Sequence, residues 1–195
     1  PEMMRLFKSV VDIVNSDQIK VKRPKMVMEA VPVQMSDAQA AIMEMVANES
    51  AIPPTKEERS KFLTLSGIAK RACISPRLLG VDDDGSKMIA CANKVKQVFD
   101  ETSDVRGAQL IFTDIFNSSD ADGVVKYVGG MDGYTGKKWN LNDHLKELLV
   151  RSGIPAEQIG VIHDVDKAKG GDEGKDAAKE ALFAKVRSGE IRVLI

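Results

Sequence analysis

Polar and charged side chains end or follow two apolar segments in the second half of the chain, where strands are expected to end. The segments are residues 108–116 and 159–163. In an α/β sheet the carboxyl ends of parallel strands form the edge where ligands bind, and lysines there can neutralise phosphates. The candidate binding residues are Asn117, His163, Asp164, Lys167 and Lys169.

Two of these candidates also fit an ordinary structural role. His163 fits a polar residue that ends a strand, and Asp164 fits a helix N-cap or an Asx-turn. From position alone, both interpretations stay open for each residue.

The sequence contains none of the common phosphate-binding or nucleophile motifs. There is no G-x-x-x-x-G-K-[ST] loop, no D-E-x-[HD] magnesium motif, no G-x-G-x-x-G fingerprint and no G-x-S-x-G elbow. Cys73 and Cys91 lack C-x-x-C spacing, and His144 and His163 lack ligand-spaced partners. We therefore expect no zinc site and two buried free thiols, which are typical of a reducing, cytoplasmic location.

Residues 105–195 predict the alternating strands and helices that would position these candidates. The expected strands are 108–116, 159–163 and 191–195, and the expected helices begin near residues 140 and 173. This β-α-β-α-β order with short connections implies a parallel sheet. The uninterrupted apolar run 108–116 is typical of a strand buried on both faces.

The stretch between Phe116 and Trp139 breaks this alternation. It is rich in Gly and Asp and is longer than the usual βα loop of roughly 2–6 residues. Residues 124–128 and 137–140 are able to pair as a small hairpin, and a mobile surface loop fits equally well.

Residues 1–104 predict a mostly helical region with one strand. The strand is Lys25–Gln34, an edge strand because it carries Pro32. Ser36 with Gln39 forms a capping box for the helix 37–47, and Thr55 with Glu58 begins a second helix that ends near Ala72. A third helix is expected over 87–102.

The composition is that of an ordinary globular protein. Of the 195 residues 43% are hydrophobic and 29% charged, and the formal net charge is −1. No apolar run approaches the ~20 residues that cross a bilayer, so we expect no membrane partner. The near-neutral charge disfavours a dedicated nucleic-acid binder but is compatible with one lobe of a two-lobe motor.

Four sequence blocks stand out along the chain: RPKMVMEAVPVQMSDAQ, LSGIAKRACISPRLL, GSKMIACANKVKQVFDETSDVRGAQLIFTDIF, and LKELLVRSGIPAEQIGVIHDVDKAKG with ALFAKVRSGEIRVLI. Together they resemble a known family, the helicase-like, DNA-translocating ATPases of the Snf type in superfamily 2, with related phage and plasmid helicase-methylase proteins. In order, the blocks resemble the family's extended link between lobes, the helix that follows it, motif IV and the run into motif V. Ser75 stands where the family usually has a histidine.

The resemblance implies a fold and a function. The fold would be α/β, a partial RecA-like parallel three-layer sheet that ends just before motif V, preceded by the helical inter-lobe region. Thr113, in motif IV, would touch the backbone of the tracked strand, and Asn117, His163, Asp164, Lys167 and Lys169 would add DNA contacts. The partners would be double-stranded DNA and an N-terminal RecA-like lobe.

The resemblance also implies that ATP and Mg²⁺ bind only in a complete parent enzyme. The family's Walker motifs lie upstream of these blocks and its arginine finger lies beyond them, so this fragment alone is expected to be inactive and to carry no cofactor.

Two rival hypotheses stay open. One is a non-catalytic α/β interaction module that docks a protein partner. The other is a nucleotide-binding or receiver-like domain, which the missing acidic cluster after a first strand disfavours. A half-built sheet would also leave an open edge, which predicts self-association through an edge strand.

Overall fold

The computed structural model describes residues 11, 25–115, 117, 122–165 and 171–195. It divides into two compact units, Pro1–Val31 and Pro32–Ile195. The described part of the first unit is Val11 and the extended segment 25–31, whose Met26, Val27 and Met28 are 78–83% exposed.

The predicted strand Lys25–Gln34 is wrong. The segment is extended, but it pairs with no strand among the described residues. An extended segment forms a ladder only where a neighbour satisfies its backbone groups, and Pro32 lacks one of the donors.

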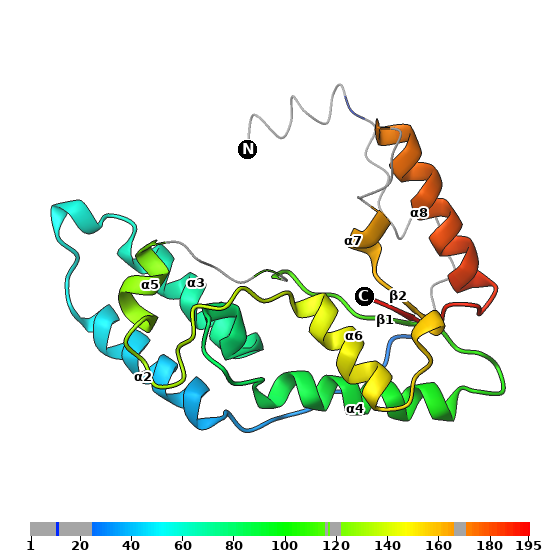
Figure 1. Cartoon of the computed structure of the whole chain (residues 1–195), viewed down its shortest axis with the longest axis horizontal. Coiled ribbons are helices and arrows are strands. Elements are labelled where there is room, and N and C mark those ends of the chain that lie inside the picture. Colours follow the sequence, from blue (N-terminus) through cyan, green and yellow to red (C-terminus); the bar gives the residue numbers. More distant parts are fainter. Residues whose placement is uncertain (1–10, 12–24, 116, 118–121, 166–170) are drawn as a thin grey trace. The chain divides into compact units, whose positions relative to one another are not determined.

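A helical hairpin opens the second unit (Figure 1). It consists of α2 (Asp37–Ala51), the short 3-10 turn η1 (Lys56–Glu58) and α3 (Lys61–Ile74). The capping box at Ser36 is confirmed: its hydroxyl accepts from the Gln39 N–H at 3.2 Å, and the Gln39 carboxamide accepts from the Ser36 N–H at 3.0 Å. The buried Gln39 also donates to the Ala72 carbonyl at 2.8 Å, which ties α2 to the end of α3.

The Gly- and Asp-rich stretch forms a helix that belongs to this helical region. α5 (Asp122–Val128) packs on α3, with Val124 and Val128 buried. Lys126 Nζ lies 2.6 Å from Glu58 Oε1. The predicted hairpin of 124–128 with 137–140 is therefore wrong, because two valines four residues apart form one helical face.

The segment that follows α5 connects it to the residues between α3 and α4. After α5, Tyr134 forms an antiparallel bridge with Val81, and the Thr135 N–H donates to the Gly80 carbonyl at 2.8 Å. Val81 follows the 3-10 helix η2 (Pro76–Leu79). A second hydrophobic core forms here, from Ile42, Leu65, Ile68, Ala72, Leu79, Val81, Val124 and Val128.

A small parallel sheet forms the other half of the unit. Its strands are β1 (Gln109–Leu110), β2 (Ile159–Gly160) and β3 (Val193–Leu194), in the order β1-β3-β2. Val193 is level with Gln109 on one side and with Ile159 on the other. The predicted parallel arrangement is confirmed, although each strand is shorter than its apolar run.

Three helices accompany the sheet, and all three were expected from the sequence. They are α4 (Ser86–Glu101), α6 (Leu141–Arg151) and α8 (Gly171–Arg187). Asn140 caps α6 by accepting from the Asp143 N–H at 3.1 Å. Gly153 and Gly189 follow α6 and α8 with φ of 97° and 72°, a conformation that terminates helices readily only at glycine.

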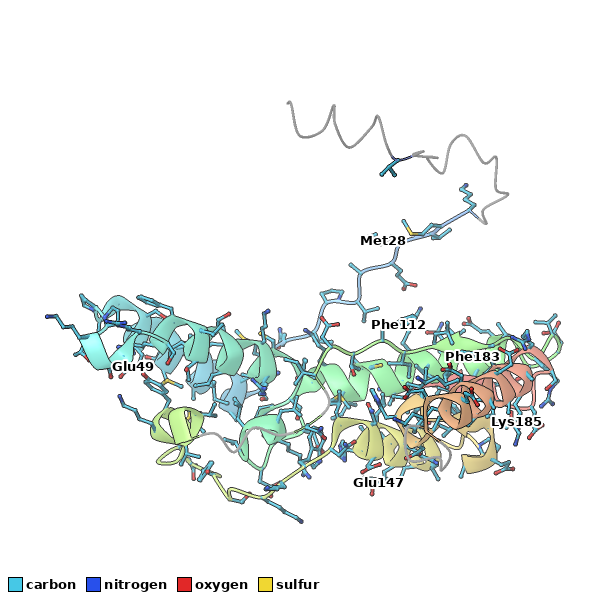
Figure 2. The ribbon with its side chains drawn as sticks, turned by 90° about the horizontal axis from the view of Figure 1, so that it is seen from above. Met28, Glu49, Phe112, Glu147, Phe183 and Lys185 are labelled. Carbon is cyan, nitrogen blue, oxygen red and sulfur yellow. The ribbon has the colours of Figure 1, made fainter. Side chains whose placement is uncertain are left out.

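The two faces of the sheet are covered unequally. On the face toward α4 and α6 the strand side chains are buried, as shown by Ile159, Val161, Val193 and Ile195. On the opposite face α8 approaches Gly160, where an added β-carbon would lie 3.1 Å from Leu182 Cδ1. Leu110 is 55% exposed on that face and Phe112 is 87% exposed (Figure 2). The expectation that 108–116 is buried on both faces is therefore wrong.

Arg192 connects the sheet to the end of α4. Its buried guanidinium donates to the Phe99 carbonyl at 2.6 Å and to Thr102 Oγ1 at 3.0 Å, and it stacks 3.8 Å from the centre of the Phe99 ring. A cation at a helix C-terminus satisfies carbonyls that have no partner inside the helix. The last expected strand therefore carries a structural arginine.

Two smaller elements complete the described chain. The 3-10 turn η3 (Ala156–Gln158) precedes β2, and α7 (Ile162–Val165) follows it directly. Across the described ranges, the helices are too short or too polar to traverse a bilayer.

Candidate nucleic-acid interface

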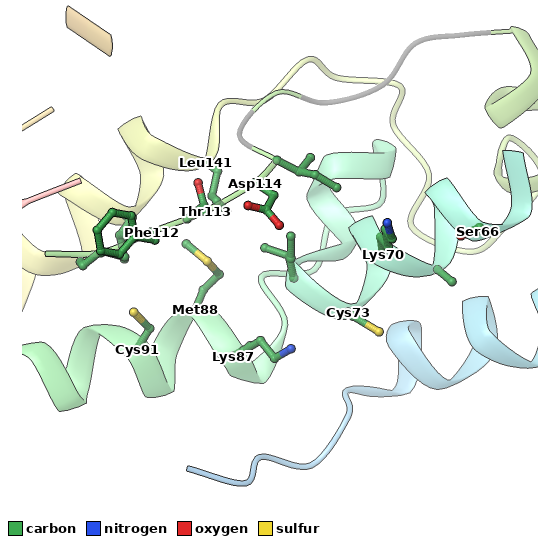
Figure 3. Close-up of a pocket in the computed structure, with 15 residues that line it drawn as sticks. Ser66, Lys70, Cys73, Lys87, Met88, Cys91, Phe112, Thr113, Asp114 and Leu141 are labelled. Carbon is green, nitrogen blue, oxygen red and sulfur yellow. The ribbon is translucent and has the colours of Figure 1, made fainter. Parts of the chain in front are cut away.

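Thr113 lies in a cleft between the helical region and the sheet. The cleft has a volume of about 720 Å³ and is bordered by α3, by the start of α4 and by the residues that follow β1 (Figure 3). Thr113 is half-buried and comes three residues after the end of β1. The expected strand 108–116 placed Thr113 within the strand, whereas β1 ends at Leu110, so the structure places Thr113 just beyond the carboxyl end of a parallel strand.

A network of hydrogen bonds connects the start of α2 to the start of α4. Asp83 Oδ1 accepts from the Ser36 hydroxyl at 2.9 Å and from the Gly85 N–H at 2.8 Å. Gly85 has a φ of 71°, and a β-carbon there would lie 3.1 Å from Gln39 Nε2. Residues from the two ends of the helical region therefore determine how α4 begins.

Two lysines give the cleft its positive charge. Lys70 on α3 and Lys87 on α4 both line it and both are exposed. Within the described ranges neither lysine forms an ion pair, whereas Lys61, only nine residues before Lys70, is buried against Glu49 at 3.1 Å. Asp114 is the acidic residue that lines the cleft, so its charged side chains sum to +2 − 1 = +1.

The sequence indicated the cleft-facing lysines only indirectly. Ser66, Ala69, Lys70 and Cys73 are three and four residues apart, which places them on one face of α3. This spacing predicts that the four residues share a surface of α3. It does not predict that the segment after β1, more than thirty residues away in the sequence, lies across the cleft from them. Sequence reasoning therefore missed Lys70 and Lys87.

Both cysteines line the cleft, and their environments differ from the expectation. Cys73 is exposed, so the prediction that both thiols are buried is wrong, and Cys91 is half-buried. Burial raises the pKa of the Cys91 thiol above its ordinary value of 9.0. At neutral pH Cys91 is therefore protonated and a poor nucleophile.

Asn117 has a structural partner. Its Oδ1 accepts from Asn140 Nδ2 at 2.9 Å, and the two residues form an antiparallel bridge. Asn140 is the N-cap of α6, so Asn117 connects the segment after β1 to the start of that helix. Asn117 does not line the cleft.

His163 and Asp164 lie in α7 and not at the end of an extended strand. The expected strand 159–163 stops at Gly160, and α7 begins two residues later. Both side chains are exposed at the carboxyl end of β2. Since β3 separates β1 from β2, they are two strand spacings, roughly 10 Å, from the line of β1. They do not line the cleft, and Lys167 and Lys169 lie outside the described residues.

The polar groups that line this cleft are able to bind an anion. They are two hydroxyls, two ammonium groups, one carboxylate and the two thiols, and they surround a mostly apolar floor. Within the described residues, no group of three His, Cys, Asp or Glu side chains is arranged to hold a metal ion.

Comparison of the chain with protein-family models, with curated proteins and with solved structures gave no match.

Proposed function

We propose that this chain is part of a DNA-dependent ATPase of the helicase-like Snf type, in which it contributes contacts to the DNA backbone. The observation that supports this most is the cleft in which Thr113 lies together with Lys70 and Lys87. The resemblance of the sequence assigned Thr113 to the tracked strand, and the two lysines come from elements that carry no such assignment.

Phosphodiester groups fit this cleft chemically. Lysines bind phosphates as point charges, and the Thr113 hydroxyl is able to donate a hydrogen bond to a phosphate oxygen. Such contacts carry no base sequence information, which suits an enzyme that moves along DNA. Asp114 opposes the phosphate charge, so we expect it to weaken binding.

In this proposal the parallel sheet is part of a RecA-like lobe, and ATP with Mg²⁺ binds between that lobe and another. The described residues do not fit a triphosphate by themselves, since none of their glycine-rich turns joins a strand to the start of a helix. No step of hydrolysis is therefore assigned to them.

A charge-reversal experiment tests the proposal. The variant Lys70→Glu/Lys87→Glu changes the net charge from −1 to −5, since each substitution subtracts two charges. The control Lys56→Glu/Lys146→Glu has the same net charge, and neither of its residues lines the cleft. We expect the cleft variant to bind a fluorescent DNA duplex at least ten-fold more weakly than the control at low salt. Equal affinities of the two variants would overturn the proposal.

Asp114 provides an opposite test in the same assay. Asp114→Asn removes the acidic side chain from the cleft, so duplex binding should tighten by about two- to five-fold, as expected for one charge in a solvated site. Unchanged or weaker binding would mean that DNA does not approach this cleft.

A second candidate function is an interaction module that docks a protein partner. The exposed Leu110 and Phe112 favour it, because a large apolar side chain that is 87% exposed beside a groove is typical of a contact surface. Absence of duplex binding by the unmodified chain would favour this second function.

A further inference from the structure

The outer edge of β1 has no partner among the described strands. In the order β1-β3-β2, β1 pairs on one side only. The N–H groups of Gln109 and Ile111 donate to β3, to the carbonyls of Arg192 and Leu194, at 2.8 Å each. Since backbone groups alternate sides along a strand, those of Leu110 and Phe112 face away from the sheet.

The extended character of this edge continues beyond the two residues of β1. From Gln109 to Ile115 the side chains alternate strictly between half-buried and exposed, with Leu110, Phe112 and Asp114 on the exposed face. An alternation of period two is the pattern of a strand. Ala108, Leu110 and Phe112 therefore present backbone donors and acceptors to a further strand, and the bend at Asp114 ends this pattern.

An apolar groove lies beside this edge. It has a volume of about 430 Å³ and separates α8 from the exposed face of β1 and β3. Its apolar lining includes Leu110, Phe112, Ile162, Phe183, Val186 and Leu194. A free edge together with an adjoining apolar groove is the arrangement that accepts an added β-strand.

We propose that this surface binds a second copy of the chain, through antiparallel pairing of the two β1 edges about a two-fold axis. A strand that pairs with its own copy in this way makes an isologous interface, and in such a pair the outward groups of one copy meet those of the other. This proposal does not depend on the proposed DNA function.

The register follows from the side chains. Centring the two-fold axis on Ile111 places Leu110 of one copy opposite Phe112 of the other, twice. Each of these pairs exchanges two backbone hydrogen bonds, because both residues face outward. Aromatic and aliphatic side chains on one face then form favourable cross-strand pairs.

Neighbouring registers are less favourable. Centring the axis on Leu110 leaves each Phe112 opposite Ala108. Centring it on Phe112 brings each Leu110 opposite the charged Asp114. The register centred on Ile111 is therefore the one that buries both apolar side chains without burying a carboxylate beside them.

Sedimentation velocity of the 195-residue chain from about 1 to 200 µM tests the pairing, and we expect a reversible monomer–dimer equilibrium. Leu110→Lys and Phe112→Lys should each weaken dimerisation at least ten-fold, since lysine protects natural edge strands from pairing. The matched control is Leu63→Lys on α3, where an apolar side chain is 78% exposed far from the edge. A chain that stays monomeric throughout overturns the proposal, as does a dimer that both edge variants retain.

Hydrogen exchange of the unmodified chain gives a test that needs no variant. The Leu110 and Phe112 amides should exchange more slowly at 200 µM than at 1 µM, while the Gln109 and Ile111 amides, already bonded to β3, should change little. The Ile159 and Val161 amides face the outer edge of β2. If these amides become protected at high concentration in place of those of Leu110 and Phe112, the chain pairs through β2, and the proposal is overturned.

Discussion

The helical region and the sheet region of the second unit differ in how completely their cores are covered. In the helical region α5 returns from about fifty residues further along the chain to pack Val124 and Val128 against α3. In the sheet region α4 and α6 cover one face fully, whereas the other face keeps Leu110 and Phe112 exposed. An apolar sequence alone therefore does not tell which face of a strand is covered, since residues 108–116 carry apolar side chains on both faces.

The largest expected effect is a difference in the free energy of unfolding between substitutions on the two faces of the sheet. Leu149→Ala removes a fully buried side chain of α6 and should lower the free energy of unfolding by about 3 kcal/mol. Leu110→Ala removes an exposed side chain and should cost less than ~0.5 kcal/mol in the monomer. Urea denaturation at a concentration where the chain is monomeric measures both, and similar losses would mean that the outer face is covered in solution.

The next prediction tests the coverage of the helical region. Val128→Ala creates a cavity in the core that α5 forms with α3, and it should lower the free energy of unfolding by about 2 kcal/mol. Val125, on the same helix, is 38% exposed, so Val125→Ala should cost less than ~0.5 kcal/mol. If both variants unfold at the urea concentration of the unmodified chain, α5 does not belong to this core.

The smallest expected effect concerns the surface contact between α5 and η1. The hydrogen bond from Lys126 holds the pKa of the Glu58 carboxyl below its ordinary value of 4.5, and the Thr55 N–H adds to this effect. A depressed folded pKa contributes stability that is present above 4.5 and is lost as the pH falls through the folded value. The melting temperature of the unmodified chain should therefore exceed that of Glu58→Gln slightly at pH 7, and the difference should shrink as the pH is lowered below 4.5. A difference that stays the same from pH 7 into the acid range would contradict this.

Sequence reasoning was most successful where the signals are local. The capping box at Ser36 and the helix that begins near residue 140 depend on residues a few positions apart, and both are confirmed. The parallel pairing of three strands also followed from the order of elements.

The errors arise where contacts are distant in sequence. Whether 25–34 forms a strand depends on a partner edge, and whether 122–128 forms a helix depends on the surface of α3. Lys70 and Lys87 become members of one site only when α3, α4 and the segment after β1 meet. No short sequence motif encodes contacts between segments that are so far apart in the chain. Among the predicted binding residues that the structure describes, Thr113 is therefore the one that lines the cleft.

The central claim is that Lys70 and Lys87 neutralise DNA phosphates, and the salt dependence of duplex binding tests it most directly. Each phosphate contact contributes roughly −0.9 to the slope of log affinity against log salt concentration. Fluorescence anisotropy from about 20 to 200 mM salt should therefore give a slope that is less steep by roughly 1.8 in Lys70→Gln/Lys87→Gln than in the unmodified chain. Identical slopes, or no duplex binding at the lowest salt, would contradict the account.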